Sequence, residues 1–287
     1  MHRDFPMPGP LVASARAWLA DPSRGAPQAR PSASVLLLRD GADGVEVFAF
    51  RRAATMAFAP DVMAFPGGGV DPRDADADPP WAGPSAQHWA RALHLPEPQA
   101  RQVVLAAARE LFEECGVLLA GPHGDDLVGE LDDPSWHADR QGLLSRSHSF
   151  AELLTARGLV LRSDLMSHVG HWVTPVCEPR RYDTHFFAAA MPQGQEADGH
   201  TTEAAQARWV PAAQMLAEQA AGHEDMLPPT QVLAEQLVAA GSVASFLGSV
   251  RPVRRVQPWP VEHAGSLWMR APVDADGDGV LDAPDEG

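Results

Sequence analysis

Two stretches near the start of the chain have the apolar content of β-strands. Residues Ser32–Arg39 and Val45–Arg52 are rich in β-type apolar side chains, and the Asp- and Gly-containing segment 40–44 lies between them. Gly and Asp tolerate the backbone angles of tight turns, so the pattern predicts a β-hairpin. Three later apolar runs are also predicted to be strands: His171–Val176, Thr184–Met191 and Ala207–Val210.

Apolar residues recur with helical spacing between and after these strands. The pattern predicts a short helix over Val12–Leu19 and longer helices over about 99–115, 211–221 and 228–240. Gly116 directly follows the second of these helices, at the position where glycine commonly ends a helix. Strands interleaved with helices, with a hairpin as well as crossovers, favour an α/β fold whose mixed sheet is covered on both faces.

Composition along the chain predicts three regions. Residues 1–31 form a proline-punctuated N-terminal arm, residues 32–240 form the main domain, and residues 241–287 form a C-terminal extension with an acidic tail. Within the main domain, residues 70–98 are rich in Pro, Asp and Ala and show no period, which is typical of a surface insertion. We expect three apolar side chains of this insertion to anchor it, namely Trp81, Trp89 and Leu93.

The helix predicted over 99–115 carries three glutamates on one sector. Glu110, Glu113 and Glu114 are spaced i, i+3 and i+4, whereas the apolar residues of the helix form a different stripe. Like charges at this spacing repel, and the helix dipole disfavours anions near the C-terminus. Local stability therefore does not explain the cluster. It is either a solvated acidic face or a functional feature, and in both cases we expect the sector to face solvent.

The sequence around this helix resembles the Nudix hydrolase signature. The string "RELFEECGV" (109–117) follows "FPGGG" (65–69), and in that family a glycine-rich loop leads into a helix with this pattern of Arg, Glu and Gly. The resemblance implies an α/β/α Nudix sandwich and hydrolysis of a diphosphate linked to another moiety. Here residues 70–98 split the signature. The split form, with the segments 180–187 and 227–230, resembles the branch that contains the peroxisomal coenzyme A diphosphatases.

The resemblance also implies a metal site. Glu110, Glu113 and Glu114, with the backbone carbonyl of Gly68, would hold Mg²⁺ or Mn²⁺, which prefer oxygen ligands. Glu110 would align the attacking water or take its proton. Arg109 would support the glycine loop by pairing with a carboxylate.

Two further acidic positions stay open at this point. The split signature lacks its usual early glutamate, so either Asp71 or Asp74 takes the role of partner to Arg109. Glu203, which precedes a predicted strand, is either an additional metal ligand or base, or a surface residue.

Other polar residues are candidates for binding rather than catalysis. Four arginines would hold phosphate oxygens, and ordinary salt bridges are the alternative for each: Arg51, Arg52, Arg180 and Arg181. The spacing of His168 and His171 is typical of metal ligands, but in a predicted strand we interpret it as incidental. Cys115 falls on the apolar stripe of its helix, which predicts a packing role rather than a nucleophile.

Charge and cysteine content limit the partners. The formal net charge is −16, and all 22 basic residues are arginines, which argues against non-specific binding to nucleic acid or to anionic membranes. The chain has 2 cysteines and neither a secretory signal nor a membrane span, so we expect a cytoplasmic protein acting on a small-molecule nucleotide. The sequence leaves a homodimer open.

The predicted function is metal-dependent hydrolysis of coenzyme A or acyl-coenzyme A. The alternatives are a pyrophosphatase for ADP-ribose, NADH or dinucleotides, and a non-catalytic Nudix protein that senses a ligand. No glycine-spaced coenzyme A motif is evident before "FPGGG".

The acidic C-terminal segment matches part of a calcium-binding pattern. Asp274, Asp276, Asp278, Gly279 and Asp282 fit an EF-hand loop, but the last ligand position holds Asp285 and no exiting helix can follow in the sequence. We predict a solvated tail without a catalytic role, and weak calcium binding is the alternative.

Overall fold

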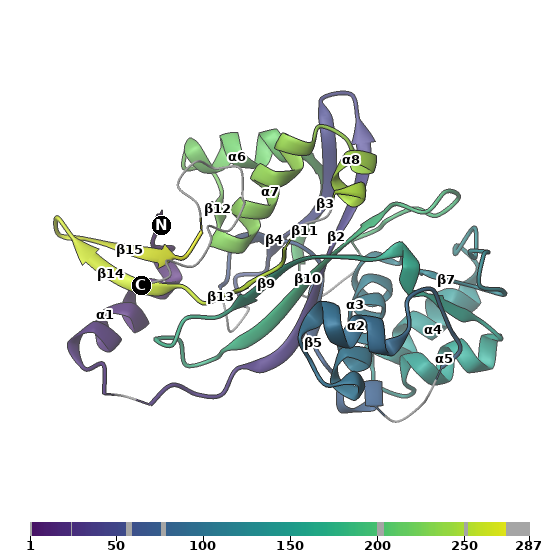
Figure 1. The fold of residues 1–287 in the computed structure, drawn as a ribbon. Helices are drawn as coiled ribbons and strands as arrows, with labels where there is room; N and C mark the ends of the chain where they lie inside the picture. The colour runs from purple at the N-terminus through teal and green to yellow at the C-terminus, as the bar shows by residue number, and fades with distance from the viewer. Residues whose placement is uncertain are drawn as a thin grey trace.

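The computed structural model describes residues 2–23, 25–55, 59–75, 79–199, 204–249 and 252–273. In this part of the chain a large mixed sheet lies between two groups of helices, and a smaller sheet joins the two ends of the chain (Figure 1). A search of the same residues finds no helix with the length and hydrophobicity needed to cross a membrane.

The large sheet has the strand order β12-β4-β3-β2-β10-β9-β13, with β11 paired to β3 and β5 paired to β2. β2 and β3 form the predicted antiparallel hairpin, whereas β10 runs parallel to β2, so the sheet is mixed as expected. Its strands are β2 (Arg30–Gly41), β3 (Gly44–Arg52), β4 (Val62–Ala64), β5 (Gly67–Gly69), β9 (Ser167–Val173), β10 (Tyr182–Ala190), β11 (Ala204–Pro211), β12 (Asp225–Met226) and β13 (Arg255–Val256).

Helices cover both faces of this sheet, which confirms the predicted α/β sandwich. Along β2, alternate side chains enter two separate cores, because successive residues of a strand point to opposite faces. Val35 and Leu37 pack toward α2 (Ala86–Leu93) and α3 (Glu97–Cys115), on what we term the α3 face. Leu36 and Leu38 enter the core under α6 (Ala212–Ala220), α7 (Pro228–Ala240) and α8 (Val243–Gly248), on the α7 face.

The helix that carries the glutamates ends where the sequence predicts. Gly116 adopts a left-handed conformation with φ of 68°, and its N–H donates to the carbonyl of Phe112. Glycine takes this conformation without the steric cost that a Cβ atom imposes. The helix begins slightly earlier than expected, at Glu97, because Pro98 is tolerated in its first turn.

The insertion at residues 70–98 is anchored to the core. It contains the 3-10 helix η2 (Pro72–Ala75), the strand β6 (Trp81–Ala82) and the helix α2. Trp89 and Leu93 of α2 are buried in the core on the α3 face, as predicted, and Trp81 is partly buried against it. Helix α2 was not predicted, because the whole Pro-, Asp- and Ala-rich segment around it was interpreted as an insertion without a period.

A second group of elements, also not predicted, packs beside α3. Helices α4 (Pro134–Leu144) and α5 (Phe150–Arg157) lie near a small sheet with the order β6-β8-β7, in which β7 is Ala120–Gly121 and β8 is Val160–Arg162. Side chains of both helices are buried in the core on the α3 face, namely Leu143 of α4 and Phe150 and Leu154 of α5. Ser149 and Glu152 form a capping box at the start of α5, a signal readable from sequence.

The two ends of the described chain meet in a three-stranded sheet, shown beside α1 (Val12–Ala20) in Figure 1. Strand β1 (Arg3–Pro6) pairs antiparallel with β15 (Ser266–Ala271), which also pairs with β14 (Trp259–His263). The segments predicted as an N-terminal arm and a C-terminal extension thus form one unit. The predicted calcium loop at 274–285 lies outside the described residues, and Val273 just before it is fully buried.

Candidate active site

Helix α3 places Arg109, Glu110, Glu113 and Glu114 together, but not at the surface. All four residues are buried, with exposed fractions of 6%, 8%, 9% and 5% respectively. The expectation that this sector faces solvent was therefore wrong. The physical reason is that β5, η2 and α4 pack against α3, and no pattern in the sequence predicted the last two elements. Burial of three like charges costs free energy unless a cation accompanies them.

The glycines of β5 bring the backbone against these carboxylates. The N–H of Gly67 donates to Glu114 Oε2 at 2.7 Å. A Cβ atom on Gly68 would lie 2.5 Å from Glu110 Oε1, inside van der Waals contact. Any larger residue at position 68 would have to displace the Glu110 carboxylate, so glycine permits this close approach between the strand and the glutamate.

Arg109 links the glutamates to the loop. Its Nη1 donates to Glu110 Oε1 at 2.8 Å and to Glu113 Oε2 at 3.1 Å, while Nη2 donates to the carbonyl of Gly69 at 2.9 Å. Its Nε and Nη2 also donate to the two carboxylate oxygens of Asp74, at 3.1 and 3.2 Å. The guanidinium thus holds the loop and the helix in a fixed relation.

Asp74 rather than Asp71 is the partner of Arg109. Asp74 lies in η2 and is buried, so the insertion supplies the carboxylate that the split signature lacks. Asp71 instead accepts hydrogen bonds from Arg73, and this interaction lowers its pKa to about 2. The sequence could not choose between the two, because only the fold of η2 decides which carboxylate faces α3.

The electrostatics of the centre fit a divalent cation. Burial raises the pKa of Glu113 and of Asp74, despite the opposing effect of Arg109. Burial disfavours the charge on Arg109, but Glu110, Asp74 and Glu113 together raise its pKa. The positive charge of Arg109 is smaller than the total negative charge of Asp74 and the three glutamates of α3. An all-oxygen set with excess negative charge is suited to Mg²⁺ or Mn²⁺.

Arg140, which the sequence did not identify, holds the end of α3 in place. Its Nε donates to the carbonyl of Glu113 at 2.8 Å, and its Nη1 donates to both carboxylate oxygens of Asp198. The side chain is buried. Because the last carbonyls of a helix lack partners within the helix, this contact satisfies one of them and positions the turn that carries Glu113 and Glu114.

The other predicted binding residues have different surroundings. Arg51 is exposed at the end of β3 and lies 3.5 Å from Glu224, Arg52 follows it on the strand, and Arg180 is exposed. The predicted phosphate-binding role of Arg181 does not agree with the structure. This residue is buried, and its guanidinium donates to the carbonyls of Thr174, Pro175 and Pro27 and to Gln257. Because these hydrogen bonds occupy its guanidinium, Arg181 is no longer a candidate for binding phosphate.

Two remaining predictions concern Glu203 and Cys115. Glu203 lies outside the described residues, so its role stays a prediction. Cys115 is fully buried in the core on the α3 face, and burial raises the pKa of its thiol well above the usual value. A buried neutral thiol is a poor nucleophile, in agreement with the predicted packing role.

An α/β sandwich that holds buried glutamates against a glycine strand is the arrangement that the resemblance to the Nudix signature implies. Comparison with known families agrees, since the model of the NUDT19 Nudix domain matches residues 84–235. The chain therefore belongs to the Nudix hydrolase family.

Known relatives support this assignment. The crystal structure of a Nudix hydrolase from Alicyclobacillus acidocaldarius is 30% identical, with a TM-score of 0.62, and the match covers 78% of this chain and 99% of that one. The acyl-coenzyme A diphosphatase NUDT19 of Gallus gallus is 28% identical over 56% of this chain and 55% of its own length. A Caenorhabditis elegans protein described as nudix hydrolase 7 is 28% identical over 65% of this chain and 53% of its own length. The chain spans about half the length of these two curated relatives.

Proposed function

We propose that the protein hydrolyses the diphosphate of coenzyme A or of an acyl-coenzyme A, in the presence of Mg²⁺ or Mn²⁺. The observation that carries the hydrolase assignment is the set of buried glutamates held against Gly68 by Arg109 and Asp74. The choice of substrate rests on similarity to a protein described as an acyl-coenzyme A diphosphatase. Water would add to one phosphorus atom while the bond from that phosphorus to the bridging oxygen breaks, giving 4′-phosphopantetheine or its acyl derivative and 3′,5′-ADP.

The residues of the centre have distinct proposed roles. Glu110, Glu113 and Glu114, with the carbonyl of Gly68, are the proposed metal ligands. A bound divalent cation neutralises charge on the phosphoryl oxygens and makes water a better nucleophile. Glu110 is also the proposed group that aligns the water or accepts its proton. Arg109 keeps the helix and the glycine strand in register through its contacts with Asp74 and Gly69.

Substrate phosphates would be held at the surface by arginines. Arg51, Arg52 and Arg180 keep this proposed role, and a bidentate guanidinium suits phosphate oxygens. Arg51 forms a long ion pair with Glu224, in which Nη1 and Oε1 are 3.5 Å apart, and 43% of the arginine side chain is exposed. An exposed pair of this kind is weak, so exchange of the carboxylate for a phosphate costs little. Glu203 remains the proposed additional ligand or base.

The cellular compartment in which the protein acts is also a proposal. Cys115 and Cys177 are both unpaired, which is compatible with a reducing compartment, so we propose action in the cytoplasm on a free nucleotide. The alternatives from the sequence remain: turnover of ADP-ribose, NADH or dinucleotides, and ligand sensing without turnover. The complete set of Arg109, Glu110, Glu113 and Glu114 speaks against pure sensing, because a protein without turnover would tolerate loss of some of these carboxylates.

A turnover screen tests the substrate. The full chain would be incubated with Mg²⁺ or Mn²⁺ and with coenzyme A, acyl-coenzyme A, ADP-ribose, NADH and diadenosine polyphosphates, and products would be identified by mass. We expect coenzyme A or its acyl derivative to give the highest kcat/KM. A clear preference for ADP-ribose or a dinucleotide would replace the proposed substrate, and no turnover of any compound would favour the sensing alternative.

A further inference from the structure

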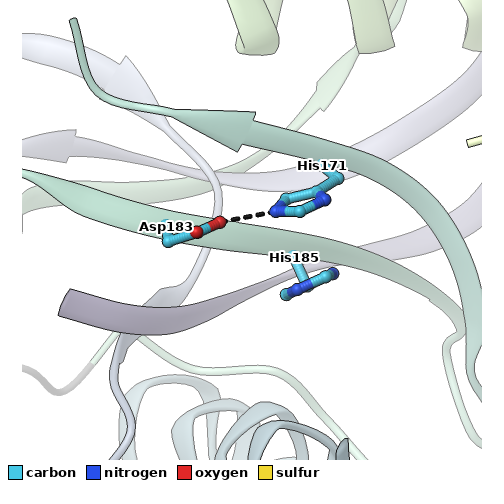
Figure 2. Close-up of side chains that lie close together, drawn as sticks. All are labelled: His171, Asp183 and His185. Atoms are coloured by element: carbon cyan, nitrogen blue, oxygen red, sulfur yellow. Dashed lines mark hydrogen bonds and ion pairs between the residues drawn. The ribbon is translucent and has the colours of Figure 1, made fainter. Parts of the chain in front are cut away.

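A second cluster of polar side chains lies on β9 and β10, away from the glutamates. His171 of β9 is directly opposite His185 of β10 in the antiparallel ladder, and their rings stack with centroids 4.0 Å apart. Asp183 of β10 lies 2.5 Å from His171, between its Oδ1 and the ring Nε2 (Figure 2). One ligand atom from each of the three residues lies within 4.8 Å of the others.

Both imidazoles are almost completely buried. His185 is 2% exposed and His171 is 8% exposed. Imidazole nitrogens are common ligands of transition-metal ions, and burial keeps these two rings away from bulk water.

A further histidine orients the cluster. His168 Nε2 lies 3.1 Å from His185 Nδ1, and this contact holds the His185 ring in place. On the other side, Arg255 Nε lies 3.9 Å from the second oxygen of Asp183. Contacts of this kind fix the ring and carboxylate of metal ligands in known sites.

We propose that His171, Asp183 and His185 bind one transition-metal ion of the zinc class. Two imidazoles and a carboxylate are a zinc ligand set, whereas Mg²⁺ prefers oxygen ligands alone. The ion would replace the hydrogen bond between His171 and Asp183. Ligand atoms on tetrahedral zinc lie about 3.3 Å apart, so binding requires a contraction of at most about 1.5 Å and a rotation that turns one of the stacked imidazoles toward the ion.

The site lies on the same face of the sheet as the glutamates, yet is distinct from them. His185 pairs with Ala33 of β2, and Ala33 pairs with Gly68 of β5. Directly paired residues share a face, and Ala33 packs in the core on the α3 face. Neighbouring strands are about 4.8 Å apart, which places β10 about 10 Å from β5. The carboxylate centre and the histidine site therefore use different side chains on different elements.

Zinc titration of the full chain tests this proposal. Metal-free protein would be titrated with Zn²⁺ by calorimetry in saturating Mg²⁺, which keeps the carboxylate centre occupied. We expect one Zn²⁺ site in the wild type, and a Kd more than about 100-fold weaker in His185→Gln and Asp183→Asn. His123→Ala removes an exposed imidazole elsewhere and should leave the Kd unchanged.

Two further measurements separate a lost ligand from a lost fold. His168→Ala, which removes a supporting contact only, should weaken Zn²⁺ roughly 10- to 100-fold. Co²⁺ in place of Zn²⁺ should give intense visible absorption in the wild type and in Glu113→Gln, but not in His185→Gln. The proposal is overturned if the wild type has no site up to about 1 mM Zn²⁺, or if folded His185→Gln binds as tightly as the wild type.

Discussion

At the scale of single residues, Gly68 is a position of the candidate site where we expect a substitution to lower activity strongly. A Cβ atom on Gly68 would clash with the Glu110 carboxylate, whereas one on the neighbouring Gly69 would have open space around it. The two glycines look equivalent in the sequence, and the resemblance to a known motif singled out only Gly68. Their difference comes from the packing of β5 on α3.

Gly68→Ala should therefore abolish most turnover, while Gly69→Ala should not. The added methyl group would displace the Glu110 carboxylate, and a displacement of about 1 Å in a catalytic group can cost about 100-fold in rate. The measurement is kcat of both variants at saturating divalent metal. Equal kcat values for the two variants would show that close contact with Glu110 is not required.

At the scale of elements, the sequence predicted α3 and its end at Gly116, because period and terminating glycine agree. It did not predict α2, η2 or α4, whose short segments carry few apolar repeats. Those elements decide two features of the site: η2 supplies Asp74, and α4 supplies Arg140. Burial of the glutamates could not be predicted without them.

Arg140→Met should lower the free energy of unfolding by about 2 kcal/mol, because the carbonyl of Glu113 and the carboxylate of Asp198 both lose a donor. Chemical denaturation measures this change. Arg91→Met is the matched control, since Arg91 is exposed on α2. A similar small effect in both variants would mean that Arg140 does not hold the end of α3.

At the scale of the whole molecule, segments that are far apart in the sequence pack and pair with one another. The family model matches residues 84–235, yet Gly68 of the site and the paired terminal strands lie outside that range. Pairing of β1 with β15 was not predicted, because no local pattern indicates which distant strand a short segment will join. The terminal sheet adds Phe5 to the core on the α7 face.

Phe5→Ala should destabilise the protein by roughly 3 kcal/mol, the usual cost of truncating a buried phenylalanine. Since Phe5 packs on the face opposite α3, kcat at a temperature where the variant is folded should stay within about twofold of wild type. Leu144→Ala, with 41% of that leucine exposed, serves as a control for stability. An unchanged free energy of unfolding for Phe5→Ala would contradict a structural role of the terminal sheet.

The central claim is that the buried glutamates of α3 hold the catalytic metal. Glu113→Gln and Glu114→Gln each remove one charge and keep the side-chain shape. Glu113→Gln weakens the buried ion pair with Arg109, while repulsion among the carboxylates falls in both variants, so the free energy of unfolding of each metal-free variant is measured together with kcat. Glu97→Gln changes an exposed glutamate in the first turn of the same helix and is the control.

The most direct test is kcat of these variants at saturating Mg²⁺ or Mn²⁺, on whichever diphosphate the wild type turns over fastest. We predict a fall of at least about 100-fold for Glu113→Gln and Glu114→Gln, equivalent to about 2.7 kcal/mol in the barrier, and no change for Glu97→Gln. Retention of kcat within about threefold of wild type, a difference of only ~0.65 kcal/mol, would contradict the assignment of these glutamates as metal ligands.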